Sequence, residues 1–404
     1  MTAAPFVAAD RVLRINESPS STAANRVREL KAAGRRILDL TVGEPDFDTP
    51  QHIKDAAVRA IQAGETKYTA VNGTPALRDA IRQRMLRTSG IEYADANITV
   101  GGGGKQVIYV AFAATLNVGD EVIIPAPFWV SYPDMVLAND GVPVIVETDA
   151  STCYKLTPEA LRKGITERTT WLVLNAPSNP AGVTYTREEL QALSQVLADF
   201  PRVQVLSDEI YDEIYFGNEP FVRLAQAAPE LRDRILTVNG VSKSYAMTGW
   251  RLGYGLGNPG LIRAMNKLQS QSSSCPSSIS QAAAVAALTG DQSFIAESVA
   301  VYRARRDRAV ELFDAIDGLS VIAPEGAFYV FVGCSGFIGR RTFDGRTLAT
   351  DGDVVAYLLE SAGVAVIQGS AYGADPFFRV SFATDMQTIE AAAAAIAGSR
   401  ARLQ

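Results

Sequence analysis

The sequence predicts an α/β protein, with a doubly wound, mostly parallel sheet in a large domain and a smaller α+β domain packed against it. Three observations predict this fold class. The chain has 404 residues, which exceeds the size of most single hydrophobic cores, so two packed units are expected. Short apolar runs alternate with helical patterns over most of the chain. After about residue 290 the pattern changes to one long helical stretch followed by strand-like runs.

Five apolar runs predict the strands of the large domain. Each leads into a helical pattern, and runs without polar alternation are typical of parallel strands that are buried on both faces. Ligands bind beyond the carboxyl ends of such strands, so the polar residues there are expected to share one pocket. The five runs are "NITVGGGG", "DEVIIPAP", "WLVLNAPSNPAG", "VQVLSDEIY" and "RILTVNGVSK".

Changes of pattern give the expected domain boundaries. Residues 1–49 contain a helical segment, "TAANRVRELKAAG", and are expected to form an N-terminal arm and part of the small domain. Residues 50–290 are expected to form the large domain that carries the pocket. Residues 291–404 begin with the helical stretch "FIAESVAVYRARRDRAVELFDAI" and are expected to form the small C-terminal domain.

Charge and cysteine content narrow the possible partners. The formal net charge of −6 disfavours a nucleic-acid partner, which needs a basic face. No apolar run reaches the roughly 18 to 20 residues that cross a bilayer, and the first residues lack the pattern of a secretory signal. The three cysteines, Cys153, Cys275 and Cys334, lie far apart, as expected of a cytoplasmic protein without structural zinc.

The chain contains a single histidine, His52, just where a helix is expected to begin after Pro50. One histidine cannot build a metal site with several histidine ligands, and no serine-nucleophile motif accompanies it. Any acid–base chemistry is therefore expected to use a lysine, a tyrosine or a carboxylate.

A glycine-rich turn, "VGGGGKQV", follows the first predicted strand and opens a helix. Free backbone N–H groups and the positive end of the helix dipole suit an anion such as a phosphate. A nucleotide-binding P-loop would place Ser or Thr where Gln106 stands, so that interpretation fails at the magnesium ligand. The alternative is a tight turn that binds nothing.

Other strand ends supply complementary groups. Lys243 and Arg251 lie in "VNGVSKSYAMTGWRLGY", Asp208 and Tyr211 in "VLSDEIYDE", and Asn179 in "NAPSNPAG". Taken singly, these residues could be a surface charge, a helix cap or turn residues. Taken together with a phosphate site, they match the needs of pyridoxal phosphate: an amine for its aldehyde, an anion for its pyridine nitrogen and donors for its phenolic oxygen.

The chain also resembles a known family, the class I aminotransferases of pyridoxal-phosphate fold type I, and within it the bacterial aspartate aminotransferases. The resemblance covers nearly the whole chain, and the motifs occur in the order of the family. The motifs are "LTVGEPDFDTP", "GETKYTAVNGTPALRDAI", "GGGGKQV", "GDEVIIPAPFWVSYP", "NAPSNPAG", "SDEIYDE", "SKSYAMTGWRLGY", "PEGAFYV" and "FFRVSFAT".

The resemblance implies a role for each matched residue around the cofactor. Lys243 would be the Schiff-base lysine and the proton carrier, and Trp129 would stack on the ring. Tyr68 would reach the phosphate of the neighbouring subunit, which implies a homodimer with shared active sites. Asp208, Tyr211 and Asn179 would contact the ring, whereas the residues around the phosphate would be Gly103, Gly104, Lys105, Ser242 and Arg251.

The resemblance also implies a substrate site. Arg379 would bind the α-carboxylate as a planar fork, with Gly43, Trp129 and Asn179 beside it. No arginine stands where one branch of the family binds the distal carboxylate from the partner subunit. The bacterial branch instead uses the residues matched by Lys105, Ser20 and Thr22.

The expected activity is a ping-pong transfer of the amino group from L-aspartate to 2-oxoglutarate. Glyoxylate or an aromatic substrate stays open as an alternative, as does a pyridoxal-phosphate-dependent lyase on the same fold. A non-catalytic regulator is disfavoured, because no attached DNA-binding segment is evident.

Two departures from the family pattern stand out. Gly240 replaces a phosphate-binding serine, so one phosphate contact is expected to be missing or replaced, and Asp212-Glu213 replaces the usual Glu-His, with no predicted consequence.

Overall fold

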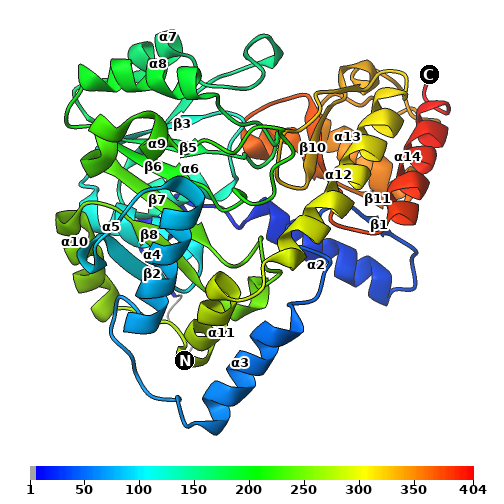
Figure 1. Ribbon diagram of the computed structural model, residues 1–404. Helices are drawn as coiled ribbons and strands as arrows, with labels where there is room; N and C mark the ends of the chain where they lie inside the picture. Colours follow the sequence, from blue (N-terminus) through cyan, green and yellow to red (C-terminus); the bar gives the residue numbers. More distant parts are fainter. Residues whose placement is uncertain (1–5) are drawn as a thin grey trace, which may run out of the picture.

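The computed structural model describes residues 6–404, which form two units that lie side by side (Figure 1). The larger unit is built on a seven-stranded sheet, and the smaller one contains two long helices, α12 (Ser293–Asp314) and α14 (Met386–Arg400). Among the described residues, no helix combines the length and the hydropathy that a membrane crossing requires.

The large sheet has the strand order β2-β8-β7-β6-β5-β3-β4. Every neighbouring pair is parallel except those of β8, which is antiparallel to both β2 and β7. This confirms the predicted mostly parallel sheet, and the five predicted strands correspond to β2, β3, β5, β6 and β7. The bounds are β2 Ile98–Gly101, β3 Glu121–Pro125, β4 Val142–Val146, β5 Thr169–Asn175, β6 Gln204–Asp208, β7 Ile235–Gly240 and β8 Gly253–Leu256.

Helices cover both faces of this sheet, as in other doubly wound folds. Local signals set several helix starts. The α8 helix begins with a capping box, in which Thr186 Oγ1 accepts from the Glu189 amide and the Glu189 carboxylate accepts from the Thr186 amide. The helices are α3 Gln51–Gln62, α4 Pro75–Ser89, α5 Gly104–Thr115, α6 Ser131–Ala138, α7 Pro158–Gly164, α8 Arg187–Ala198, α9 Leu224–Ala227, α10 Pro259–Ser270 and α11 Ser278–Thr289.

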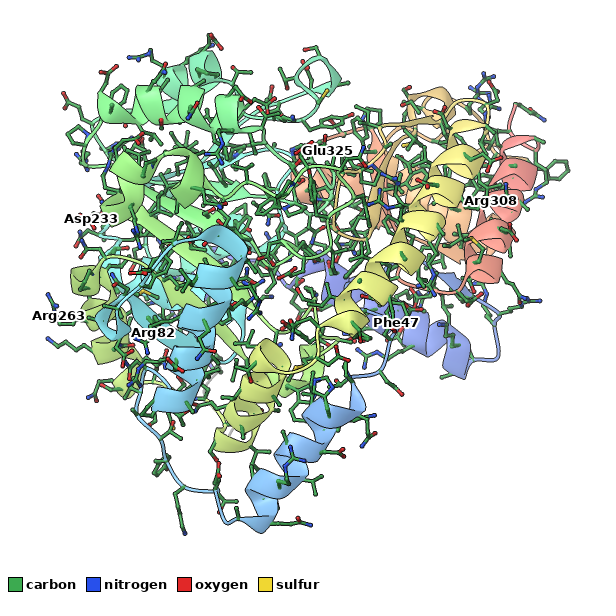
Figure 2. All side chains as sticks on the ribbon, in the orientation of Figure 1. Phe47, Arg82, Asp233, Arg263, Arg308 and Glu325 are labelled. Atoms are coloured by element: carbon green, nitrogen blue, oxygen red, sulfur yellow. The ribbon has the colours of Figure 1, made fainter. Side chains whose placement is uncertain are left out.

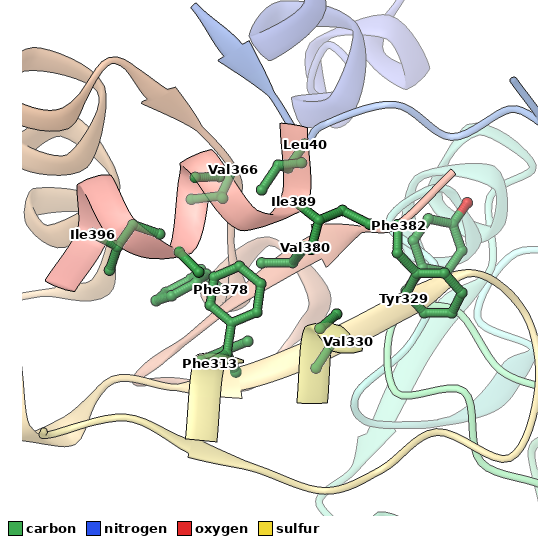
Figure 3. Close-up of a cluster of buried hydrophobic side chains, with 14 of the residues drawn as sticks. Leu40, Phe313, Tyr329, Val330, Val366, Phe378, Val380, Phe382, Ile389 and Ile396 are labelled. Atoms are coloured by element: carbon green, nitrogen blue, oxygen red, sulfur yellow. The ribbon is translucent and has the colours of Figure 1, made fainter. Parts of the chain in front are cut away.

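The smaller unit contains a four-stranded antiparallel sheet with the order β12-β13-β10-β9. Its core joins that sheet to α12 and α14: Phe313, Phe378, Val380, Ile389 and Ile396 pack together and are buried (Figure 3). The remaining bounds are β9 Ser320–Val321, β10 Tyr329–Gly333, α13 Asp351–Tyr357, β11 Val364–Ala365, β12 Ile367–Gln368 and β13 Phe377–Ser381.

The N-terminal segment contacts both units. Its short helix α1 (Asp10–Leu13) is followed by Arg14, which forms an ion pair with Asp140 just after α6 of the large unit. The chain then continues through α2 (Pro19–Ala32) to β1 (Leu38–Asp39), which pairs in parallel with β11 of the small unit. Residues 19–39 are therefore held by the smaller unit.

The two long helices of the smaller unit lie next to each other, with polar pairs at their surface. Arg308 of α12 (Figure 2) donates to Glu390 of α14 at 2.9 Å. Both side chains are substantially exposed, so this pair contributes little to stability. The buried apolar contacts between the helices and the sheet provide most of the stabilisation.

Strand β8 approaches the glycine turn before α5 so closely that only glycine fits. A Cβ atom on Gly253 would lie 2.3 Å from the amide nitrogen of Gly104, and the turn itself needs the positive φ of 102° at Gly103. Contact with strand β8 therefore fixes the position of the turn at Gly103 and Gly104.

We expect Gly253→Ala to lower the free energy of unfolding by about 1–3 kcal/mol, because the new methyl group overlaps backbone atoms that cannot move aside. Urea unfolding of the protein measures this loss. The matched control is Gly249→Ala, because no atom lies within 4 Å of the added Cβ there. Equal stability of the two variants would contradict the close approach.

Candidate active site

One cavity of about 460 Å³ lies beyond the carboxyl ends of the parallel strands, between the two units. It brings together side chains from the ends of β5, β6 and β7, from the start of α5 and from β13. Twelve of the residues expected from the sequence line it: Ser20, Gly43, Gly104, Lys105, Trp129, Asn179, Asp208, Tyr211, Ser242, Lys243, Arg251 and Arg379.

Three expected residues lie outside the lining. Gly103 is the N-cap of α5 and lies directly behind Arg251. Thr22 is exposed on α2, and its neighbour Ser21 lines the cavity instead. Tyr68 is 90% exposed and contacts none of the cavity within this chain.

Asp208 ends strand β6 and is only 5% exposed. One carboxylate oxygen accepts from the Tyr132 hydroxyl at 2.6 Å, and the other accepts from the Ile210 amide at 3.2 Å. Burial raises the pKa of Asp208 to about 6, although the hydrogen bond from Tyr132 opposes this rise. The chain continues as a turn, so Asp208 does not cap a helix.

Lys243 follows strand β7, the neighbour of β6 in the sheet. Its Nζ atom donates to the carbonyl oxygen of Gly43, which belongs to the segment between β1 and α3. Burial lowers the pKa of Lys243 to about 8, which increases the fraction of neutral, nucleophilic amine near neutral pH.

The glycine turn and Arg251 lie together at one end of the cavity, in an arrangement that suits an anion. The guanidinium group of Arg251 donates to the carbonyls of Thr248 at 2.8 Å and Gly102 at 3.2 Å. A Cβ atom on Gly103 would lie 2.7 Å from Nη2 of Arg251, so the backbone must be bare there. The start of α5 directs its unpaired N–H groups and its positive dipole end toward the same place.

Arg379 is the buried cation of the small-unit side, at 2% exposure. Its Nη1 atom donates to Asn179 Oδ1 at 3.0 Å and its Nη2 atom donates to the Thr41 carbonyl at 2.7 Å. Its Cζ atom lies over the ring of Tyr329, 4.2 Å from the centroid, and 5.3 Å from the centroid of the Tyr372 ring. The buried Nε atom has no hydrogen-bond partner within the described residues.

Lys105 and Trp129 form another wall of the cavity. The ammonium group of Lys105 lies 4.9 Å from the centroid of the indole ring, a cation–π distance. Partial burial, together with the nearby charge of Arg251, lowers the pKa of Lys105. Trp129 packs edge-to-face on Tyr132 with centroids 5.2 Å apart, which holds the indole in a defined orientation.

Sequence reasoning missed three groups at this site. Tyr132 follows Trp129 by three residues in "PFWVSY", and that helical spacing was an available signal. Tyr329, whose hydroxyl lies 2.9 Å from that of Tyr211, follows Phe328 in "GAFYVF" without a distinguishing pattern. Thr41 contributes its carbonyl to Arg379, and a backbone group leaves no trace in the sequence.

The two departures from the family pattern lie away from the cavity. Gly240 packs against strand β8, where an added Cβ would be 3.0 Å from the Leu252 carbonyl, and it is not part of the lining. Asp212 and Glu213 also lie outside the lining, on the opposite side of the turn that carries Tyr211.

Comparison with known proteins identifies the family. The family model described as aminotransferase class I and II matches residues 35–396. The aspartate/prephenate aminotransferase of Cereibacter sphaeroides is 50% identical over 387 residues, which cover 96% of this chain and 97% of that protein. The aspartate aminotransferase of Rhizobium meliloti is 49% identical over 400 residues, which cover 99% and 98% of the two chains.

The chain belongs to the class I and II aminotransferases.

Solved structures agree with this family and with the predicted fold type I. The aminotransferase superimposes on the crystal structure of the Rhizobium meliloti aspartate aminotransferase with a TM-score of 0.96 at 48% identity, covering 99% of this chain and 100% of the other. For the Thermus thermophilus aspartate aminotransferase with maleate the TM-score is 0.90 at 37% identity, with 98% and 100% covered.

The cofactor of this aminotransferase is pyridoxal 5′-phosphate, as the family implies, and the residues present fit it. The bare glycine turn beside Arg251 is shaped for a phosphate. A partly buried amine of lowered pKa, Lys243, and a buried carboxylate, Asp208, line the same cavity. These groups suit an aldehyde and a protonated ring nitrogen, respectively.

The raised pKa of Asp208 predicts a pH-dependent effect on stability. The folded protein keeps a proton on this carboxyl group that the unfolded chain has lost, so the free energy of unfolding falls as the pH rises from about 4 to about 6. We expect Asp208→Asn, which removes the titration, to stabilise the cofactor-free protein by up to about 3 kcal/mol near pH 8. Near pH 4 the gain should vanish.

Urea unfolding of the cofactor-free aminotransferase at both pH values measures this difference. The control is Asp233→Asn, an exposed carboxylate outside the cavity (Figure 2), which should leave stability nearly unchanged at either pH. A destabilised Asp208→Asn protein near pH 8 would show that the folded state stabilises the ionised carboxylate.

Proposed function

We propose that this aminotransferase transfers the amino group of L-aspartate to 2-oxoglutarate by a ping-pong mechanism. The observation that carries the proposal is the convergence of Lys243, Asp208 and Arg379 on one cavity. The names of the relatives from Cereibacter sphaeroides and Rhizobium meliloti, both of which include aspartate, support the choice of donor.

We propose that the cofactor-binding residues act as the family resemblance implies. When bound, pyridoxal phosphate supplies an aldehyde that condenses with amines and a protonated ring that accepts an electron pair. Lys243 would hold the aldehyde, Asp208 would keep the ring nitrogen protonated, and Trp129 would stack on the ring. Tyr211 and Asn179 would face the phenolic oxygen. The phosphate would lie among Gly103, Gly104, Lys105, Ser242 and Arg251.

Lys243 would act both as anchor and as proton carrier. Once an incoming amino acid takes its place, the freed amine can accept the proton of the substrate Cα atom. Its pKa of about 8 places it close to physiological pH, where a general base and acid is most effective. The carbonyl of Gly43, which accepts from Nζ, would orient the amine between these roles.

Arg379 would bind the substrate α-carboxylate. A guanidinium already fixed by Asn179 and the Thr41 carbonyl, and flanked by Tyr329, has little freedom left to lose on binding. Gly43 would lie close to the same carboxylate. This clamp would set the direction of the Cα–H bond relative to the ring.

The distal carboxylate of aspartate would bind Lys105, with Ser20 and Thr22 beside it. Lys105 and Ser20 line the cavity, which supports this arrangement, whereas Thr22 would have to approach from the exposed face of α2. Trp129, next to the Lys105 ammonium group, would restrict where that charge can move.

We further propose a cytoplasmic homodimer with shared active sites. The exposed ring of Tyr68 is available to reach the phosphate in a neighbouring subunit. The three cysteines are unpaired among the described residues, which suits a reducing compartment.

We also propose that the chain is divided into an N-terminal arm with part of the small domain (residues 1–49), a large domain (50–290) and a small C-terminal domain (291–404). The pairing of β1 with β11 supports the assignment of part of the first segment to the small domain.

A second acceptor is favoured by the names of several relatives, which are called aspartate/prephenate aminotransferases. Prephenate combines a 2-oxo acid with a second carboxylate on a ring. A single flexible lysine, Lys105, tolerates a more distant carboxylate better than a rigid arginine fork would. We therefore propose prephenate as a candidate acceptor in addition to 2-oxoglutarate.

Steady-state rates for a panel of donor and acceptor pairs test the function. We expect aspartate with 2-oxoglutarate to be a preferred pair, and Lys105→Met to lower kcat/KM for aspartate roughly tenfold to a hundredfold, the value of a charge-assisted hydrogen bond. An aromatic donor has no distal carboxylate and should lose only the contribution of the proposed phosphate contact of Lys105, so its kcat/KM should fall less than that of aspartate.

The control for this experiment is Lys163→Met, an exposed lysine of α7 outside the cavity, which should leave both donors unchanged. An unaltered ratio of aspartate to aromatic activity in Lys105→Met would exclude Lys105 as the distal contact. Release of ammonia and pyruvate from a β-substituted donor, without amino transfer, would instead identify a lyase.

A further inference from the structure

Behind the turn that carries Asp208 and Tyr211 lies a buried group of five charged side chains, which we name the ion cluster. It includes Asp212 and Glu213, the pair for which the sequence predicts no consequence. Only Glu213, with 25% of its side chain exposed, reaches solvent appreciably. The members are Arg84, Glu209, Asp212, Glu213 and Arg223.

Asp212 is the centre of the ion cluster. A single carboxylate oxygen, Oδ2, accepts from Nη2 of Arg84 at 2.7 Å and from Nη2 of Arg223 at 2.7 Å. Arg223 also donates to Glu209 at 2.5 Å, and Arg84 donates to Glu213 at 3.1 Å. The two arginines hold the pKa of Asp212 below its usual value despite burial, so this carboxylate is an anion shared by two cations.

The turn from residue 208 to residue 212 has two functional sides. Asp208 and Tyr211 line the cavity, whereas Glu209 and Asp212, the residue after each, belong to the ion cluster. The Asp212 amide donates to the Glu209 carbonyl at 3.0 Å, which closes the turn. Because the backbone joins the two sides so tightly, a displacement of Asp212 displaces Tyr211 as well.

The ion cluster ties this turn to other parts of the large unit. Arg84 comes from α4, the helix that follows the segment with Tyr68. Arg223 lies just before α9 and donates to Thr88 of α4 at 3.2 Å as well. Three segments far apart in the sequence therefore meet on the side of the turn that faces away from the cavity.

Stability alone does not account for this arrangement. Desolvation of buried charges offsets most of their attraction, and apolar side chains of similar volume often stabilise a core as well or better. Charged hydrogen bonds, however, fix direction and distance more strictly than apolar contacts do. The ion cluster holds one side of the turn from residue 208 to residue 212 through Glu209 and Asp212. The other side of the same turn carries the two proposed cofactor contacts, Asp208 and Tyr211.

We propose that Asp212 is a positioning residue of the cofactor site, which holds the turn through Arg84 and Arg223 so that Asp208 and Tyr211 face the cofactor. The inference rests on the proposed cofactor contacts of Asp208 and Tyr211. It assigns to Asp212 a role in cofactor binding, although this side chain does not line the cavity.

The test is the equilibrium affinity of the cofactor-free protein for pyridoxal phosphate. Asp212→Asn keeps the size of the side chain but removes the anion that the two arginines share. The turn should shift, and the dissociation constant should rise roughly tenfold to a hundredfold, the value of one hydrogen bond to a charged group that is weakened between the turn and the cofactor. Titration followed by absorbance measures this constant independently of turnover.

The matched control is Glu121→Gln. Glu121 is a carboxylate at 4% exposure that accepts from Arg168 at 2.6 Å and Thr166 at 2.5 Å. It lies at the start of β3, the end of the sheet away from the cavity. Both variants are expected to lose free energy of unfolding, but only Asp212→Asn should lose affinity for the cofactor.

Cofactor affinity of Asp212→Asn equal to that of the unaltered protein would overturn the inference, because the ion cluster would then be purely structural. If Asp212→Asn does not fold, Arg84→Lys serves instead, since it keeps the charge but loses the guanidinium contacts. It should weaken cofactor binding severalfold, and unchanged affinity would overturn the inference equally. Failure of the unaltered protein to bind pyridoxal phosphate would refute the proposed function itself.

Discussion

The active site depends on a buried carboxylate, Asp208, and a partly buried amine, Lys243, that the sheet places at the same edge. Strands β6 and β7 are parallel neighbours in which Asp208 pairs with Val238, so the chain after β7 brings Lys243 to the cavity that Asp208 enters from β6. Burial raises the pKa of Asp208 to about 6 and lowers that of Lys243 to about 8. For each group, the charged form is therefore less favourable than it is in water. A cofactor with a protonated ring nitrogen and an aldehyde satisfies both groups.

The other elements of the site support this pair from different directions. The large unit supplies the glycine turn and Arg251, the proposed phosphate contacts, whereas the small unit supplies Arg379, the proposed contact of the substrate carboxylate. The segment between β1 and α3 joins the two sides, because the carbonyl of Thr41 holds Arg379 and that of Gly43 holds Lys243. The proposed α-carboxylate contact, Arg379, thus comes from the small unit and the proposed Schiff-base lysine, Lys243, from the large unit, and both line the same cavity.

The sequence predicts those features that each leave a local pattern. Strands buried on both faces form continuous apolar runs, and all five predicted strands are present. Two strands of the large sheet were missed: β4, with the sequence "VPVIV", is an apolar run that contains a proline and lies partly exposed at the sheet edge, and β8, with the sequence "GYGL", has glycine at alternate positions. At the site, side chains at strand exits were predictable, whereas the Thr41 carbonyl, the contact of Tyr329 with Tyr211 and the bridging role of Asp212 depend on packing between distant segments.

The central claim is that Lys243 is the amine that bonds to the cofactor aldehyde. Borohydride reduction of the cofactor-loaded protein followed by peptide mapping tests it most directly, because reduction makes the bond permanent at whichever lysine carries it. The label is expected on the peptide that contains Lys243 and is expected to be absent from a Lys243→Ala protein. A label on Lys105, the other lysine that lines the cavity, or no label on any lysine, would contradict the account.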